Sequence, residues 1–126
     1  MRERVVLADD RVEVREALRL LLEYDAGMIV IGEAADVDTL LAGVRAACPD
    51  LLLLDWELPG LDRDDALQTL RVAAPGTAII AISGHPEARR AALAAGVDAF
   101  ISKCHPPETL LGTLREFTSA ADLPFQ

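Results

Sequence analysis

The chain has 126 residues, of which 52% are hydrophobic and 26% charged, and its formal net charge is −9 at pH 7. This length fits a single globular domain, the apolar content excludes general disorder, and the acidic surplus argues against direct binding to nucleic acid, which depends on clustered Lys and Arg. No apolar run approaches the ~18 residues that cross a bilayer, and Asp9 and Asp10 follow Met1 too closely for a signal peptide, so we expect a cytoplasmic domain that does not bind membranes.

The first half of the chain alternates short apolar runs with segments of helical period. Residues 5–8 form the first run, and the apolar positions within residues 14–21 then repeat at i, i+3, i+4 and i+7, which predicts a helix with one buried side. Residues 28–31 form the second run, and residues 37–44 repeat the same helical spacing. Such short apolar runs are too short for helices and suit strands that are buried in a sheet.

A third apolar run, residues 51–54, opens the second half of the chain. The carboxylates of Asp62, Asp64 and Asp65 follow it, and residues 66–70 supply an apolar helical face. Acidic side chains at the start of a helix cap free backbone amides and oppose the helix dipole. We therefore expect a third helix that these carboxylates cap.

Two further strand–helix units complete the pattern. Residues 78–82 form a fourth run before an alanine-rich helix over residues 86–95 that ends at Gly96, and residues 99–101 form a fifth run before a helix that begins near residues 106–108. Strands that alternate with helices in this way predict an α/β fold, a doubly wound five-stranded parallel sheet of flavodoxin-like (βα)5 topology. With the second strand outside the first, the strand order is 2-1-3-4-5.

Polar residues stand at the C-terminal ends of four of these runs. Asp9 and Asp10 follow the first run, Asp55 the third, Ser83 the fourth, and Lys103, the only lysine of the chain, the fifth. Each alone has a simpler explanation, as a helix cap, a turn residue or a solvated side chain. Ligands of open α/β sheets bind at this edge, where the strand order reverses. Four loops with complementary chemistry at one edge therefore favour a binding site.

The chemistry of this set points to a phosphoryl group and a metal. Carboxylates that converge raise each other's pKa or bind a cation. Mg²⁺ prefers oxygen ligands, uses one or two carboxylates and keeps water in its shell, which a phosphate can replace. A hydroxyl at Ser83 and an ammonium at Lys103 suit a phosphoryl group opposite the metal. The set thus predicts a carboxylate nucleophile, Mg²⁺ and two phosphoryl-binding groups.

Further residues complete a known pattern. Leu58-Pro59-Gly60 follows Asp55, and Phe100 lies three residues before Lys103. With the acidic pair and Ser83-Gly84, this pattern resembles the receiver domains of two-component response regulators. The resemblance implies that Asp55 accepts a phosphoryl group and that Ser83 and Lys103 bind its oxygens. It also implies that Phe100 is a switch residue, which rotates inward as Ser83 moves toward the phosphoryl group.

The resemblance further implies a metal site and partners. Asp10, Asp55 and the backbone carbonyl of Glu57 are expected to bind Mg²⁺ directly, and Asp9 through water. The expected phosphodonor is a histidine kinase or a phosphotransfer protein, and phosphorylation is expected to allow homodimer formation. The chain is then a phosphoprotein of signal transduction rather than an enzyme, beyond catalysing its own phosphorylation and slow dephosphorylation.

The resemblance covers residues 5–117. We assign residues 1–120 to the receiver domain and residues 121–126 to a tail or the start of a linker. Gly32-Glu33-Ala34 and the helix lengths resemble the NarL/FixJ subfamily, which usually carries a helix-turn-helix DNA-binding output. A transcriptional output is therefore expected.

Four positions near the predicted site differ from the family pattern or tune it. Cys104 follows Lys103, where the family commonly has a proline, and Arg63 stands where most members have glycine. Glu57 and His85 occupy positions that tune the rates of phosphorylation and hydrolysis in this family. We expect the loop after Lys103 and these rates to be particular to this chain.

Two other functions remain open. A haloacid-dehalogenase-like phosphatase also uses an aspartyl nucleophile, and Asp55-Trp56-Glu57 resembles its acid-x-acid start, but in that family the acidic pair comes late in the chain. An interaction module that keeps the fold without phosphorylation is the second alternative. A flavin or dinucleotide site is disfavoured because the first strand–helix turn, residues 8–11, has no glycine to admit a pyrophosphate.

Overall fold

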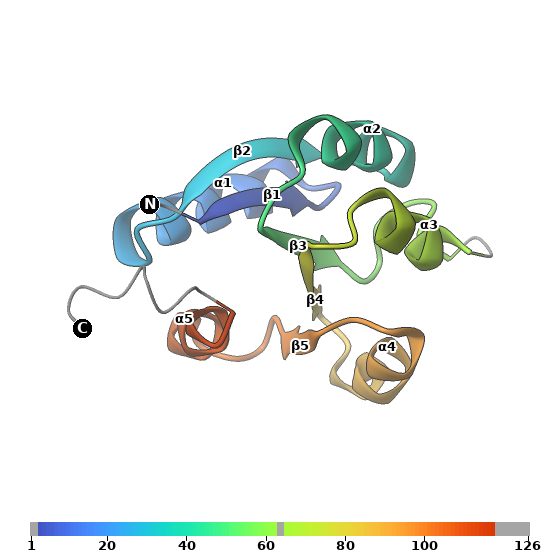
Figure 1. The fold of residues 1–126 in the computed structure, drawn as a ribbon. Helices are drawn as coiled ribbons and strands as arrows, with labels where there is room; N and C mark the ends of the chain where they lie inside the picture. Colours follow the sequence, from blue (N-terminus) through green and yellow to red (C-terminus); the bar gives the residue numbers. More distant parts are fainter. Residues whose placement is uncertain (1–2, 63–64, 118–126) are drawn as a thin grey trace.

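The computed structural model of the chain describes residues 3–62 and 65–117. The strands are β1 (Arg4–Ala8), β2 (Ile29–Ala34), β3 (Leu51–Asp55), β4 (Ala78–Ser83) and β5 (Ala99–Ser102). The helices are α1 (Val12–Leu20) with its π-helical continuation η1 (Leu21–Asp25), α2 (Val37–Ala47), α3 (Ala66–Ala73), the 3-10 turn η2 (Pro86–Ala88), α4 (Arg89–Ala95) and α5 (Pro107–Arg115). The strands form one parallel sheet in the order β2-β1-β3-β4-β5, which confirms the predicted fold and order. Figure 1 shows α1 and α5 on one face of the sheet and α2, α3 and α4 on the other.

The sheet is buried on both faces, and its side chains alternate between them. In β1, Val5 and Leu7 belong to the apolar cluster beneath α1 and α5, whereas Val6 and Ala8 belong to the cluster beneath α2, α3 and α4. The four leucines at positions 51–54 of β3 alternate in the same way and are at most 1% exposed. Leucine is a weak strand former, but each of these side chains has an apolar layer to pack against, and that burial determines the structure here.

The start of α3 differs from the sequence-based expectation. Asp65 precedes the helix with a left-handed backbone, φ 68°, and its side chain makes no capping hydrogen bond. Its backbone carbonyl instead accepts hydrogen bonds from the backbone N–H and the hydroxyl of Thr69. A side-chain cap requires an extended backbone at the capping residue, so the predicted cap is wrong for Asp65. Asp62 is exposed in the preceding turn, and Asp64 lies outside the described residues.

The alanine-rich segment before β5 is weakly anchored. It begins as the 3-10 turn η2, and only Arg89–Ala95 is α-helical. Ala92 is the one buried residue of α4. Gly96 ends the helix at φ 113°, as predicted, because glycine adopts the left-handed region without steric cost.

The order of the strands fixes where a ligand can approach. β1 pairs with both β2 and β3. The chain therefore passes from β1 to β2 at one side of the sheet and from β3 to β4 and β5 at the other. The connections after β1 and β3 therefore cross opposite faces of the sheet. At the C-terminal edge these two connections lead away from each other. Ligands of open α/β sheets bind between two such connections.

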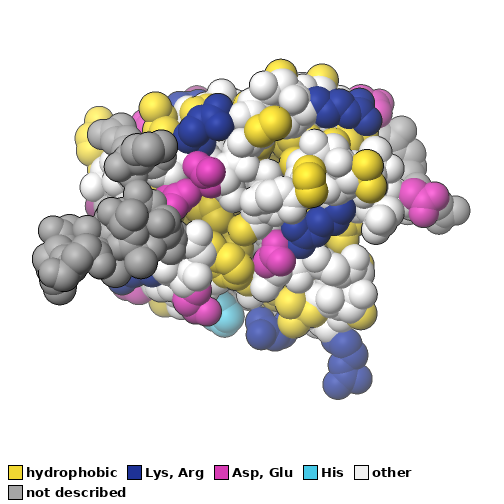
Figure 2. Space-filling view, in the orientation of Figure 1, with side chains coloured by type: hydrophobic (Ala, Val, Ile, Leu, Met, Phe, Trp, Pro, Cys, Tyr) yellow, Lys and Arg dark blue, Asp and Glu magenta, His cyan; other side chains and the backbone are white. Residues whose placement is uncertain are grey.

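The surface carries interspersed charges. Figure 2 shows Lys and Arg side chains spaced among Asp and Glu on the face drawn there. That face lacks the clustered basic side chains with which proteins bind a phosphate backbone. Within the described parts of the chain, no helix has the length and apolar character that a membrane span needs.

Candidate functional site

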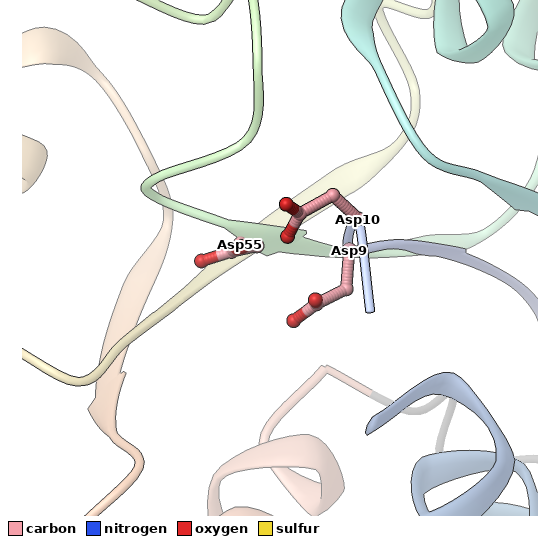
Figure 3. A group of neighbouring side chains, drawn as sticks. All are labelled: Asp9, Asp10 and Asp55. Atoms are coloured by element: carbon pink, nitrogen blue, oxygen red, sulfur yellow. The ribbon is translucent and has the colours of Figure 1, made fainter. Parts of the chain in front are cut away.

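Three carboxylates meet at the C-terminal edge of the sheet. Asp9 and Asp10 directly follow β1, and Asp55 is the last residue of β3. One oxygen from each of the three lies within 4.8 Å of the others, and Figure 3 shows the side chains projecting from the two neighbouring strands. Asp9 and Asp55 are only 2% and 5% exposed, whereas Asp10 is exposed. A donor set made only of oxygens at this spacing suits a hard divalent cation such as Mg²⁺.

Lys103 balances part of this negative charge. Its Nζ lies 3.1 Å from Asp9 Oδ2 and 3.5 Å from Asp55 Oδ1. Its backbone N–H donates a 2.7 Å hydrogen bond to the carbonyl of Ser83, which joins the end of β5 to the end of β4. The sheet therefore holds the ammonium group against two buried carboxylates.

The hydroxyl of Ser83, at the end of β4, has two close partners. It donates a 2.7 Å hydrogen bond to Glu57 Oε2 and accepts a 2.9 Å hydrogen bond from the backbone N–H of His85. Glu57 also donates its backbone N–H to Asp55 Oδ1 at 3.1 Å. From the sequence, Glu57 was expected to bind the metal through its backbone carbonyl and to occupy a position that tunes the reaction rates, but this contact of its side chain with Ser83 was not predicted.

A cleft of about 340 Å³ opens at these groups. Ser83 is fully buried and does not line it, whereas its partner Glu57 does. Both acidic and basic side chains line the cleft, so an anion that enters meets both signs of charge. The lining residues are Asp10, Arg11, Asp55, Glu57, Gly84, His85 and Lys103.

Burial raises the pKa of the Asp55 carboxyl above its ordinary value, and the charge of Asp9 adds to this effect. The backbone N–H of Glu57 and the ammonium of Lys103 act in the opposite direction. A raised native pKa means that the protonated form is favoured on folding. The stability that neutral Asp55 contributes is therefore complete below the unfolded pKa and is lost as the pH rises through the native pKa.

We expect the Asp55→Asn variant to be more stable than the wild type at pH 7 in the presence of EDTA, because the amide removes a buried charge. Thermal unfolding followed by circular dichroism measures the gain, about 4 °C in Tm for each kcal/mol relieved. The gain shrinks as the pH falls and Asp55 of the wild type becomes protonated. Asp25→Asn, at an exposed position, is the control. A lower Tm for Asp55→Asn at pH 7 contradicts this prediction and means that the pairing with Lys103 outweighs burial.

An ion-pair network between α1 and β2 contacts the backbone of the acidic pair at Asp9. Arg15 of α1 donates a 2.6 Å hydrogen bond from Nη1 to the carbonyl of Asp9 and lies 2.8 Å from Glu33 Oε1 through its Nε. Arg19 also pairs with Glu33, and its hydrogen bond holds the pKa of the Glu33 carboxyl below its ordinary value. Sequence reasoning missed this network. Its signal is Arg15 and Arg19, four residues apart on one helix face, opposite the acidic residue of Gly32-Glu33-Ala34.

The predicted switch residue Phe100 lies in β5 and is 7% exposed. It belongs to the apolar cluster beneath α2, α3 and α4, and its carbonyl accepts a 3.3 Å hydrogen bond from Arg89 Nη1. The side chain is thus already largely buried in this conformation, and its movement remains a prediction.

Cys104 donates its backbone N–H to Ser102 Oγ at 3.1 Å, a hydrogen bond that a proline at this position cannot make. Arg63 lies outside the described residues.

The sequence profile of the response regulator receiver domain family matches residues 5–115. The chain belongs to this family. The nitrate/nitrite response regulator protein NarL of Escherichia coli K12 is 30% identical over 114 residues, which cover 89% of this chain and 53% of that protein. The chain spans about half the length of the curated relatives it matches. These relatives confirm the similarity to the NarL type.

Solved structures of receiver domains agree with this assignment. A two-component response regulator of the LuxR family from Aurantimonas sp. SI85-9A1 superposes with a TM-score of 0.82 at 29% identity, over 92% of this chain and 84% of that one. A CheY-like receiver domain protein from Methanospirillum hungatei JF-1 gives a TM-score of 0.79 at 28% identity, over 92% and 93% of the two chains. Receiver domains are signalling modules, and membership of this family decides against the phosphatase alternative.

Proposed function

We propose that this receiver domain accepts a phosphoryl group on Asp55 from a histidine kinase or a phosphotransfer protein. The observation that carries the proposal is the setting of Asp55: a buried carboxylate that lines a cleft, next to the acidic pair and within 3.5 Å of the only lysine of the chain. Burial that raises its pKa also makes the ionised carboxylate more basic. Such a carboxylate is suited to act as a nucleophile.

The proposed reaction is a direct displacement at phosphorus. A carboxylate oxygen of Asp55 forms a new P–O bond while the P–N bond of a phosphohistidine, or the P–O bond of an acyl phosphate, breaks. The leaving imidazole or carboxylate takes the electron pair. Lys103 and Ser83 bind the phosphoryl oxygens, where positive charge and a hydroxyl donor stabilise the charge of the transition state.

Mg²⁺ is the cofactor that fits the acidic cluster. Asp10, Asp55 and the backbone carbonyl of Glu57 would hold it directly, and Asp9 would hold it through water. Bound there, the ion would supply positive charge against the oxygens of the transferring group. The carboxylate oxygens that come within 4.8 Å of one another support this assignment.

The phosphodonor protein docks beside the site in this proposal. An apolar groove of about 470 Å³ lies between α1 and α5 and reaches Lys103. Leu18, Leu21 and Leu110 line it, with Pro106 at its edge. A helix that carries a phosphohistidine and covers this groove would bring the phosphoryl group to the neighbouring cleft.

Phosphorylation would act as a switch for an output or partner. A phosphoryl group on Asp55 draws Ser83 and Lys103 toward it; Ser83 ends β4 and Lys103 directly follows β5, the two strands that flank the weakly anchored α4. The surface of α4, β5 and α5 is then the part that changes, and it would control homodimer formation or a transcriptional output. With a net charge of −9, the domain itself would not contact nucleic acid.

The test is direct phosphorylation of the purified chain. With Mg²⁺ and acetyl phosphate we expect one added phosphoryl group in the intact mass, because the chain itself supplies the nucleophile. EDTA in place of Mg²⁺ is expected to slow the labelling at least about tenfold. A chain that gains no phosphoryl group under these conditions favours the alternative, an interaction module that works without phosphorylation.

A further inference from the structure

The side chain of Glu57 is placed where an incoming phosphoryl group must compete with it. Its Oε2 lies 2.7 Å from Ser83 Oγ, and Glu57 lines the cleft while Ser83 is fully buried behind it. The backbone N–H of Glu57 is fixed at 3.1 Å to Asp55 Oδ1. The same residue is therefore tied to the proposed acceptor through its backbone and to Ser83 through its carboxylate.

The hydroxyl of Ser83 cannot serve two acceptors at once. A serine hydroxyl has one proton to donate, and its nearest acceptor is Glu57 Oε2 at 2.7 Å, while the carbonyl of His85 lies at 3.5 Å. The oxygen lone pairs face the backbone N–H of His85, at 2.9 Å, which belongs to the loop before η2. A phosphoryl oxygen on Asp55 can accept a hydrogen bond from Ser83 only when the hydrogen bond from Ser83 to Glu57 breaks.

We propose that the Glu57 carboxylate is a latch on Ser83: it occupies the position of the phosphoryl oxygen in the unmodified chain and holds the loop between β4 and η2 in place. This inference rests on the function proposed above and names a regulatory residue of the same site. Because the carboxylate and the phosphoryl group carry charge of the same sign, phosphorylation both removes the hydrogen-bond partner and repels the latch. Glu57 then leaves Ser83, and the loop is released at the moment the site is occupied.

Three substitutions separate the contact from the charge. Glu57→Asp keeps the negative charge but shortens the side chain by one methylene group, so the carboxylate no longer reaches Ser83. Glu57→Ala removes both the charge and the contact. Glu57→Gln removes the charge but keeps an oxygen that can accept the hydrogen bond from Ser83. Glu108→Gln is the matched control, because it removes an exposed carboxylate in the first turn of α5 that does not line the cleft.

The first measurement needs no phosphoryl group. Amide hydrogen exchange of residues 83–88 in the unmodified full chain reports the latch, because His85 donates its N–H to the hydroxyl that Glu57 holds. We expect about 3- to 10-fold faster exchange in Glu57→Ala and Glu57→Asp, the range for loss of one hydrogen bond, and wild-type exchange in Glu108→Gln. Unchanged exchange in Glu57→Ala and Glu57→Asp overturns the proposal.

The second measurement is the rate of labelling by acetyl phosphate with Mg²⁺. We expect Glu57→Ala and Glu57→Asp to be labelled about 3- to 10-fold faster than the wild type, with Glu57→Gln between them and the wild type. A wild-type rate in Glu57→Asp together with a faster rate in Glu57→Ala means that only the charge matters, and the latch is then wrong. If exchange changes as expected but no variant is labelled, the proposed phosphoryl acceptance fails while the contact itself stands as a structural restraint.

The affinity for Mg²⁺ provides the remaining check. Trp56 is the only tryptophan and precedes Glu57 directly, so quenching of its fluorescence follows metal binding at the neighbouring carboxylates. We expect similar Mg²⁺ affinities in the wild type and in Glu57→Asp. A change in affinity as large as the change in labelling rate would attribute the effect to the metal and overturn the latch.

Discussion

In the Asp55→Asn variant, incubation with Mg²⁺ and acetyl phosphate is expected to leave the intact mass unchanged. The amide has the shape of the carboxylate but no nucleophilic oxygen anion, so the P–O bond to the chain cannot form. The expected effect is complete loss, larger than that of any other single substitution at the site. Intact-mass spectrometry over the time in which the wild type is fully labelled measures it.

Two controls make this result specific. Asp10→Asn keeps the acceptor and removes a proposed metal ligand, so we expect labelling that is slow but present, and that is partly restored by higher Mg²⁺ concentration. Asp98→Asn removes a carboxylate that pairs with Arg71 at 2.7 Å, away from the cleft, and should be labelled like the wild type. Undiminished labelling of Asp55→Asn would place the acceptor on another residue and refute the central assignment.

Much of the fold follows from local sequence pattern. Each strand of a buried parallel sheet needs only a short apolar run, and the runs at residues 5–8 and 51–54 lie within β1 and β3. The order 2-1-3-4-5 then brings the ends of β1 and β3 together. Because the polar residues were predicted at the ends of strands, the topology was sufficient to predict that Asp9, Asp10 and Asp55 converge.

The partners of these residues were less predictable, because they depend on side-chain conformations that no local pattern encodes. Glu57 sits two residues after Asp55, and only the three-dimensional turn shows its carboxylate meeting Ser83, 26 residues later in the chain. The link from Arg15 to the carbonyl of Asp9 depends on how α1 lies against the end of β1. The capping prediction for Asp65 failed for a related reason, since this residue has a left-handed backbone that the sequence pattern does not reveal.

In the proposed function, Lys103 couples the site to the rest of the domain. Its ammonium bridges Asp9 and Asp55 at 3.1 and 3.5 Å, and its backbone N–H holds the carbonyl of Ser83 at 2.7 Å. A phosphoryl group on Asp55 would take the ammonium away from Asp9 and pull on β5, whose next residues lead into α5. A side chain that carries the charge in a different shape should therefore separate phosphorylation from the response.

Two substitutions of Lys103 test this separation. Lys103→Ala removes the charge that stabilises the transferring group, and we expect labelling about 100-fold slower than in the wild type. Lys103→Arg keeps the charge, so its labelling rate should lie between those of Lys103→Ala and the wild type. Its planar guanidinium is wider than an ammonium and cannot approach Asp9 and a phosphoryl oxygen on Asp55 in the same compact geometry.

We expect the labelled Lys103→Arg protein to lose most of the conformational response. Amide hydrogen exchange across residues 84–106, which include α4 and β5, should change on phosphorylation of the wild type and remain nearly unchanged in this variant. Arg45→Lys, an exposed exchange of the same two residue types on α2, controls for the substitution itself and should respond like the wild type. If fully labelled Lys103→Arg shows the wild-type change over these residues, the response does not pass through the ammonium. It must then arise at Ser83 alone, through its bond to His85 and the start of η2.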